Sequence, residues 1–204
     1  MSAATRAALM EAMLELVIER GYEATSVSDV AELAGVAAAD FDACFASKEE
    51  CAIAVFDHFQ ADFEEKVRGA YAREPTWPDN LRAASYAIAR WARENPRGMK
   101  FGTVEMMWVS EAAQARRVAG FETFLGMIEA GRAVAPDPDA IPADTAGRLM
   151  GSMAEILTRR IQGKSFDPEG FVPELMALIV GAYLGEEAGA RELAIPPPPR
   201  VEQG

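Results

Sequence analysis

The sequence has few of the residues on which catalytic sites and nucleic-acid-binding surfaces usually depend. Its 204 residues include one histidine and two cysteines, and 32 acidic side chains outnumber 20 basic ones, which gives a net charge of −12 at pH 7. This charge disfavours a membrane-surface protein and a generally basic nucleic-acid binder. An acidic chain can still carry a small DNA-binding face.

Catalytic and metal-binding patterns are also missing. The histidine, His58, falls within an expected helix and has no evident nucleophile partner, and neither a glycine-rich phosphate loop nor a cluster of metal ligands is present. Cys44 and Cys51 are separated by a spacing that is typical of neither metal nor redox sites, which predicts two partly buried thiols. We therefore expect no enzyme activity, no cofactor and no bound metal.

Long apolar runs are absent as well. The most apolar segment, MALIVGAYLG at residues 176–185, is about half as long as a bilayer span. The N-terminal residues predict a helix rather than a signal peptide. These features predict a protein without a membrane segment, located in the cytoplasm.

Helical periodicity is present almost everywhere. Apolar residues recur at intervals of three and four, strand-like alternation is absent, and half of the residues are apolar, which predicts an all-α fold with a proper core. Capping boxes are predicted at Ser26 with Asp29 and at Ser47 with Glu50. Glycine, proline and these caps divide the chain into about nine helices, at residues 5–20, 26–35, 38–45, 47–73, 80–94, 95–109, 110–134, 143–162 and 173–184, with a continuation to residue 193 as the alternative end of the last.

The helices suggest three segments. The first three form a compact head over residues 1–47, and the long helix that follows links this head to a larger helical bundle over residues 48–193. The proline-rich end, residues 194–204, predicts a disordered tail.

The motif ERGYEATSVSDVAELAGV at residues 19–36, followed by Phe45 and SKEE, resembles the tetracycline-repressor (TetR) family of bacterial transcription regulators. The match is specific over residues 5–60. Beyond it, the resemblance rests on chain length, the helical pattern and the ending VPELMALIVGAYLG. It implies a homodimer whose N-terminal helix-turn-helix binds operator DNA, while residues 48–193 bind a small effector and form the dimer interface.

The resemblance assigns DNA contacts to several residues of the head. Lys48 stands where the family's lysine meets a phosphate, and Arg6 can reach the DNA backbone. Thr25 and Ser26 begin the second helix, where hydroxyls and free amides can hold phosphate. With the exposed positions of the third helix, the predicted DNA-binding set is Arg6, Thr25, Ser26, Ala38, Asp42, Ala43 and Lys48. The alternative for Arg6, Thr25, Ser26 and Lys48 is a capping or solvated surface residue.

The third helix departs from the family pattern on its DNA-facing side. Phe41 and Phe45 keep the packing positions. The positions that usually carry serine, a variable and often basic residue, threonine, tyrosine, and histidine or tyrosine are instead Ala37, Ala38, Asp40, Asp42 and Cys44. Asp40 can accept from a cytosine amine or cap its own helix.

The acidic charge of residues 1–50 leaves two hypotheses for the function of the protein. Residues 1–50 contain three basic and ten acidic side chains, the reverse of a DNA-binding footprint. One hypothesis is a ligand-responsive, dimeric TetR-type regulator that binds DNA weakly or with an unusual preference. The other is a ligand-binding or protein-interaction module of the same fold whose helix-turn-helix no longer binds DNA. The family resemblance favours the first, and the residues alone favour the second.

The bundle is predicted to bind an apolar or aromatic effector and to dimerise. Large adaptable side chains gather in residues 86–153, and those expected to line the effector site are Trp91, Phe101, Met107, Phe124 and Met150, with ordinary core packing as the alternative. The helices at 143–162 and 173–184 are expected to pair in a homodimer, and Gly181 and Ala182 would allow close helix approach. Their apolar residues at helical spacing are Leu149, Met153, Ile156 and Leu157, and Leu175, Leu178, Ile179 and Leu184.

Overall fold

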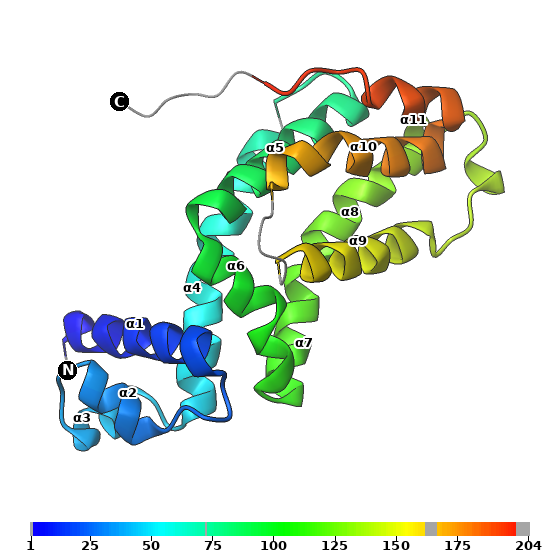
Figure 1. The fold of residues 1–204 in the computed structure, drawn as a ribbon. Helices are drawn as coiled ribbons and strands as arrows, with labels where there is room; N and C mark the ends of the chain where they lie inside the picture. The colour runs from blue at the N-terminus through cyan, green and yellow to red at the C-terminus, as the bar shows by residue number, and fades with distance from the viewer. Residues whose placement is uncertain (1, 72, 162–166, 199–204) are drawn as a thin grey trace. The chain divides into compact units, whose positions relative to one another are not determined.

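The computed structural model describes residues 2–71, 73–161 and 167–198, and within these residues it contains helices and no strands (Figure 1). The predicted all-α class is therefore confirmed. The α-helices are α1 (Ala3–Arg20), α2 (Val27–Leu33), α3 (Ala38–Cys44), α4 (Lys48–Tyr71), α5 (Trp77–Glu94), α6 (Pro96–Thr103), α7 (Glu111–Gly120), α8 (Glu122–Glu129), α9 (Thr145–Ile161), α10 (Pro168–Leu184) and α11 (Glu186–Glu192); the 3₁₀ helices are η1 (Glu105–Trp108), η2 (Ala130–Val134) and η3 (Pro138–Ala140).

The helix boundaries differ from the prediction most clearly in three places. The helix expected at 95–109 ends at Thr103 and tightens into η1, and the one expected at 110–134 divides into α7, α8 and η2. Apolar spacing does not distinguish these cases, because a short switch to 3₁₀ bonding barely changes which face is buried. α10 begins at Pro168 and contains Pro173, where the prediction began the helix.

Packing divides the chain into two compact units. One contains residues 1–65 and 94–122, and the other contains residues 66–93 and 123–204. The predicted segments at 1–47, 48–193 and 194–204 follow sequence motifs and stay predictions, and residues 199–204 of the predicted tail lie outside the described residues. None of the helices in the described ranges is long and apolar enough to cross a membrane.

The first unit has a core that joins the head to later helices. Phe41 and Phe45 of the head are buried together with Phe56 of α4 and Phe101 of α6. Gly98 makes the approach of α6 to α4 possible, because a Cβ there would lie 2.6 Å from the ring of Phe59. Residues 94–122 thus complete the core beneath the head.

Polar contacts of α6 and α7 with α1 and α4 reinforce this unit. Arg97 pairs with Glu11 at 2.6 Å, and the Lys100 ammonium donates to the Ile18 carbonyl at 3.1 Å. Arg116 of α7 pairs with Asp57 of α4 at 2.7 Å. These contacts connect α6 to α1 and α7 to α4.

The second unit is built around Trp77 of α5. The indole Nε1 donates to the Met127 carbonyl at 2.8 Å, and the ring meets Tyr183 of α10 edge to face with centroids 5.4 Å apart. The Tyr183 hydroxyl donates to Glu129 at 2.9 Å. Gly131 lies against the indole, where any Cβ would come within 2.4 Å. Each polar atom of these buried rings therefore has a partner.

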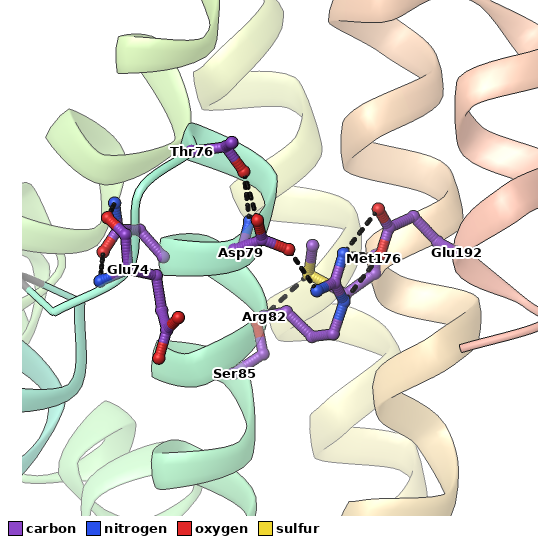
Figure 2. A network of polar contacts seen from close by, with 8 residues as sticks. Glu74, Thr76, Asp79, Arg82, Ser85, Met176 and Glu192 are labelled. Carbon is purple, nitrogen blue, oxygen red and sulfur yellow. Dashed lines mark hydrogen bonds and ion pairs between the residues drawn. The ribbon is translucent and has the colours of Figure 1, made fainter. Parts of the chain in front are cut away.

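The last helix is fixed by a close backbone approach and a buried ion pair. A Cβ on Gly189 of α11 would lie 2.5 Å from the Ala177 carbonyl oxygen of α10. Glu192, only 5 % exposed, accepts two hydrogen bonds from Arg82 of α5, at 2.9 and 2.8 Å (Figure 2). Arg82 also donates to Asp79 at 2.6 Å.

Replacing Glu192 with glutamine is expected to destabilise the second unit. The substitution removes the negative charge that faces a largely buried guanidinium, so the free energy of unfolding should fall by about 2 kcal/mol. Guanidinium-chloride unfolding measures the change. Glu187→Gln on the exposed side of α11 is the control and should shift stability by less than about 0.5 kcal/mol. Equal effects of the two variants would contradict the role of the ion pair.

Candidate nucleic-acid interface

The head has the geometry of a helix-turn-helix, with α2 and α3 joined by a tight turn. The predicted capping box at the start of α2 is present: the Ser26 hydroxyl accepts from the Asp29 amide at 3.2 Å, and the Asp29 carboxylate accepts from the Ser26 amide at 3.0 Å. Gly35 in the turn has a φ of +68°, a left-handed conformation that glycine adopts without strain. These local features set the angle at which α3 leaves α2.

α3 turns its aromatic side inward and its small side outward. Phe41 and Phe45 are each 1 % exposed, with ring centroids 5.6 Å apart, which confirms their packing roles. The residues exposed on the opposite side are Ala38, Ala39, Asp42 and Ala43. Asp40 caps the helix, because its carboxylate accepts from the Ala37 amide at 3.1 Å.

The cap of α4 differs in one detail from the prediction. The Ser47 hydroxyl accepts from the Glu50 amide at 3.0 Å, as expected. The Glu50 carboxylate, however, accepts from the amide of Ala46 at 2.7 Å rather than from that of Ser47. The reciprocal contact is therefore displaced by one residue toward the N-terminus.

Lys48 is held inside the head rather than extended from it. Its ammonium donates to the carbonyls of Tyr22 and Thr25, both at 2.9 Å, and lies 3.9 Å from the centroid of the Tyr22 ring. Burial lowers the pKa of the Lys48 ammonium. Two of its three N–H donors therefore serve the connection between α1 and α2.

The other two basic side chains of residues 2–50 also have partners within the head. Arg6 donates to the Cys44 carbonyl at 3.0 Å and its guanidinium carbon lies 4.2 Å from the centroid of the Phe45 ring. Arg20 pairs with Asp29 at 2.7 Å. Asp29 thus brings a negative charge to the first turn of α2, where a phosphate would otherwise find free amides.

The seven residues predicted to contact DNA fall into two groups. Arg6, Ser26, Ala38, Asp42 and Ala43 are exposed. Lys48 is half-buried, and Thr25 is 1 % exposed with its hydroxyl donating to the Gly21 carbonyl at 2.9 Å. The sequence motif gave no sign of the Arg20–Asp29 pair, because the two residues meet only through the turn between α1 and α2.

The residues predicted to line an effector site are divided between the two units. Phe101 and Met107 belong to the first unit, where Phe101 is fully buried in the core beneath the head and Met107 is 42 % exposed. Trp91, Phe124 and Met150 belong to the second. Trp91 and Phe124 are buried there and Met150 is half-buried.

The thiols of Cys44, in the head, and of Cys51, in α4, are both free. Cys44 is half-buried and Cys51 is buried. Burial, as the main cause, raises the pKa of the Cys51 thiol to about 12, so this group stays protonated at neutral pH. The expectation of two partly buried thiols is confirmed for Cys44, whereas Cys51 is more deeply buried than expected.

Comparison with known sequences bears on the same segment. Residues 9–55, which include all of α2 and α3, match the family model described as bacterial regulatory proteins, tetR family. Residues 9–55 therefore form a domain of the tetR family of bacterial regulatory proteins. No curated protein matches the chain in sequence.

Solved structures of TetR-type regulators share the fold over nearly the whole chain. FadR from Bacillus subtilis, solved in complex with stearoyl-CoA, is 16 % identical with a TM-score of 0.74, over 86 % of this chain and 98 % of that one. FadR from Bacillus halodurans, a fatty acid degradation regulator, is 16 % identical with a TM-score of 0.73, over 89 % and 97 %. PfmR from Thermus thermophilus is 23 % identical with a TM-score of 0.66, over 84 % and 96 %.

Lys48→Met is expected to destabilise the head. The change keeps the length of the side chain but leaves two half-buried carbonyls without their charged donor, so the free energy of unfolding should fall by about 2–3 kcal/mol. Chemical unfolding followed by circular dichroism measures it. Lys66→Met, at an exposed position of the same helix, is the control. If both variants unfold at the same denaturant concentration, the two hydrogen bonds of Lys48 do not stabilise the head.

Proposed function

We propose that the chain is a ligand-responsive transcription regulator of the TetR type, which binds operator DNA as a homodimer through α2 and α3. The observation that carries the proposal is the intact helix-turn-helix frame: the α2 cap, the Gly35 turn and the buried Phe41 and Phe45 leave the outer side of α3 free. A helix presented in this way fits the major groove of B-DNA.

In this proposal α3 reads DNA mainly by shape and by apolar contact. The exposed methyl groups of Ala38 and Ala43 can meet thymine methyls, and Asp42 can accept from a cytosine amine. Lys48 keeps one N–H beyond its two carbonyl contacts, which can donate to a phosphate. Because few cations remain for phosphates, the affinity should be modest and its salt dependence shallow.

The second candidate is a module of the same fold whose head no longer binds DNA. The specific observation in its favour is that each of the three basic side chains in residues 2–50 has a partner within the head, while ten acidic side chains share the same segment. A phosphate approaching this surface meets more repulsion than attraction. A protein partner would then replace DNA as the target.

Support for the homodimer comes from an apolar stripe on α10. Phe171, Leu175, Leu178 and Ala182 follow one another at intervals of four, three and four residues, which places them on one side of the helix. Leu178 is 46 % exposed and Ala182 is exposed, whereas Ile179 on another side is buried in the unit's own core. A second copy that covered this stripe would remove the exposed apolar surface from water.

The other residues predicted for the dimer helices have varied surroundings. Leu149 is buried, while Met153, Ile156, Leu175 and Leu184 are half-buried, and the side chain of Leu157 lies outside the described residues. Gly181 faces Gly189 of α11, because a Cβ on Gly189 would come within 2.9 Å of the Gly181 Cα. Gly181 therefore allows the approach of α11 within one subunit. In the proposed dimer, the small residue that would allow a partner helix to approach closely is Ala182.

The proposed effector is a small, largely apolar or aromatic molecule bound by the helices that follow the head. Its influence on DNA binding would pass through α4, a single helix with residues 48–65 in the first unit and 66–71 in the second. Coupling requires that DNA and effector prefer different positions of this helix in the dimer.

Fluorescence anisotropy across a salt series tests DNA binding. The protein should bind the duplex from upstream of its own gene more tightly than a random duplex. Asp42→Lys should steepen the salt dependence by about one unit, since one more phosphate is neutralised. Glu187→Lys, which makes the same charge change on α11, should leave the slope unchanged. Absence of binding to either duplex at ~50 mM salt would favour the protein-interaction module.

Leu178→Glu is expected to break the homodimer. A carboxylate in the middle of the stripe would be buried without a partner, so the dimer dissociation constant should rise by at least about 100-fold. Sedimentation velocity measures the change. Val134→Glu, at a residue of the same unit that is 53 % exposed, is the control. A wild-type protein that sediments as a monomer, or a Leu178→Glu variant that sediments as a dimer, would rule out this interface.

A further inference from the structure

α7 lies against α4 along much of its length. Its N-cap Ser110 donates to the Glu49 carboxylate at 2.7 Å, and at its other end the Gly120 carbonyl accepts from Gln60 at 3.2 Å. Ala113 is fully buried, and a Cβ on Gly120 would come within 2.9 Å of the Gln60 amide nitrogen. The side of α7 that contains Ala113 and Gly120 therefore faces inward.

Arg117 is on this inward side. It follows Ala113 by four residues and precedes Gly120 by three, so the three side-chain positions share one face of the helix. The charged residues Glu111 and Arg116 lie on exposed positions of α7. Arg117 is thus the charged residue of α7 that is half-buried in the first unit.

Arg117 differs from its neighbour Arg116 in its partners. Arg116 forms an ion pair with Asp57. The Nε atom of Arg117 is buried and has no hydrogen-bond partner, and the contact found for its guanidinium among the described residues is the Phe121 ring, at 5.4 Å. Burial lowers the pKa of the Arg117 guanidinium, with no acidic neighbour to offset it.

A half-buried guanidinium without an acid is unfavourable for folding. Arginine stays charged at neutral pH, and burying its charge without a compensating anion lowers stability. Buried polar groups of proteins nearly always have a partner, so an unpaired donor calls for an explanation. Among the described residues, no acidic side chain pairs with Arg117. The groups that bind a guanidinium most strongly are carboxylates and phosphates.

We propose that Arg117 binds the anionic group, a carboxylate or a phosphate, of an effector whose remaining part is apolar. This rests on the proposed function, since it specifies the chemical class of the effector. The neighbouring, half-buried Phe121 ring supplies apolar surface beside the charge. The bound anion provides the acceptor that the Arg117 guanidinium lacks.

Binding of three probes with one chain length tests the proposal: octanoate, octyl phosphate and 1-octanol, each titrated to about 1 mM by calorimetry. At least one of the two anions should bind at least about tenfold more tightly than the alcohol, because only an anion compensates the guanidinium. The anion that binds better tells a carboxylate effector from a phosphate effector. Arg117→Met should remove this preference, and Arg116→Met should retain it.

Thermal unfolding without any probe provides a second, independent test. Arg117→Met removes an uncompensated charge, so its melting temperature should equal or exceed that of the wild type. A large fall in melting temperature, or failure of the variant to fold, would assign Arg117 a structural role and overturn the proposal. So would equal binding of alcohol and anions, equal binding by wild type and Arg117→Met, or binding of none of the three.

Neither test involves DNA. A chain that binds the anions through Arg117 but no DNA would contradict the regulator and leave the effector site in place. A chain that binds DNA but none of the probes would contradict the effector site alone.

Discussion

The carbonyl oxygens of Tyr22 and Thr25, in the connection between α1 and α2, accept hydrogen bonds from one ammonium group, that of Lys48. The contact spans more than twenty residues of sequence and fixes the start of α2 against the start of α4. The position of α2 in turn determines that of α3, through the short Gly35 turn. The ammonium of Lys48 thus helps to hold the position from which α2 presents α3.

This arrangement has a consequence for electrostatics. Because Lys48 donates to two carbonyls inside the head, only one of its N–H groups is available for a phosphate. Arg6 and Arg20 also have partners within the head, the Cys44 carbonyl and the Asp29 carboxylate. The head thus uses its few cations to hold its own shape. Its acids, by contrast, are largely exposed, as with Asp42. Shape and charge therefore favour different targets: the frame suits a DNA groove, whereas the surface potential opposes the DNA backbone.

The sequence predicted local features of the fold well. The Ser26–Asp29 capping box, the Gly35 turn and the inward positions of Phe41 and Phe45 all follow from interactions within a few residues of one another. Their physical causes are visible in a short stretch of sequence.

Features that depend on distant contacts could not be predicted in the same way. Phe101 is a large apolar residue of the kind predicted to line the effector site. The structure places it in the core beneath the head, because α6 packs on α1 and α4. The division of the 110–134 segment and the two carbonyl partners of Lys48 likewise depend on neighbours far along the chain. The spacing of apolar residues predicts that a side chain is buried, but it does not predict which other residues the side chain packs against.

Lys48 and Arg117 show two uses of a partly buried cation. Lys48 has its acceptors within the chain, and its charge stabilises the head. The buried Nε atom of Arg117 has none among the described residues, and in our proposal the anion of an effector supplies the missing acceptor.

The position of Arg117 on α7 connects the binding of an anion to the head. α7 is bonded to α4 at Glu49, beside Lys48, and again at Asp57 and Gln60. An anion at Arg117 therefore acts on a helix of the same compact unit that contains the head. A shift of α7 along α4 would reach the Lys48 contact through Glu49, so an effector could alter the head without first acting through the second unit.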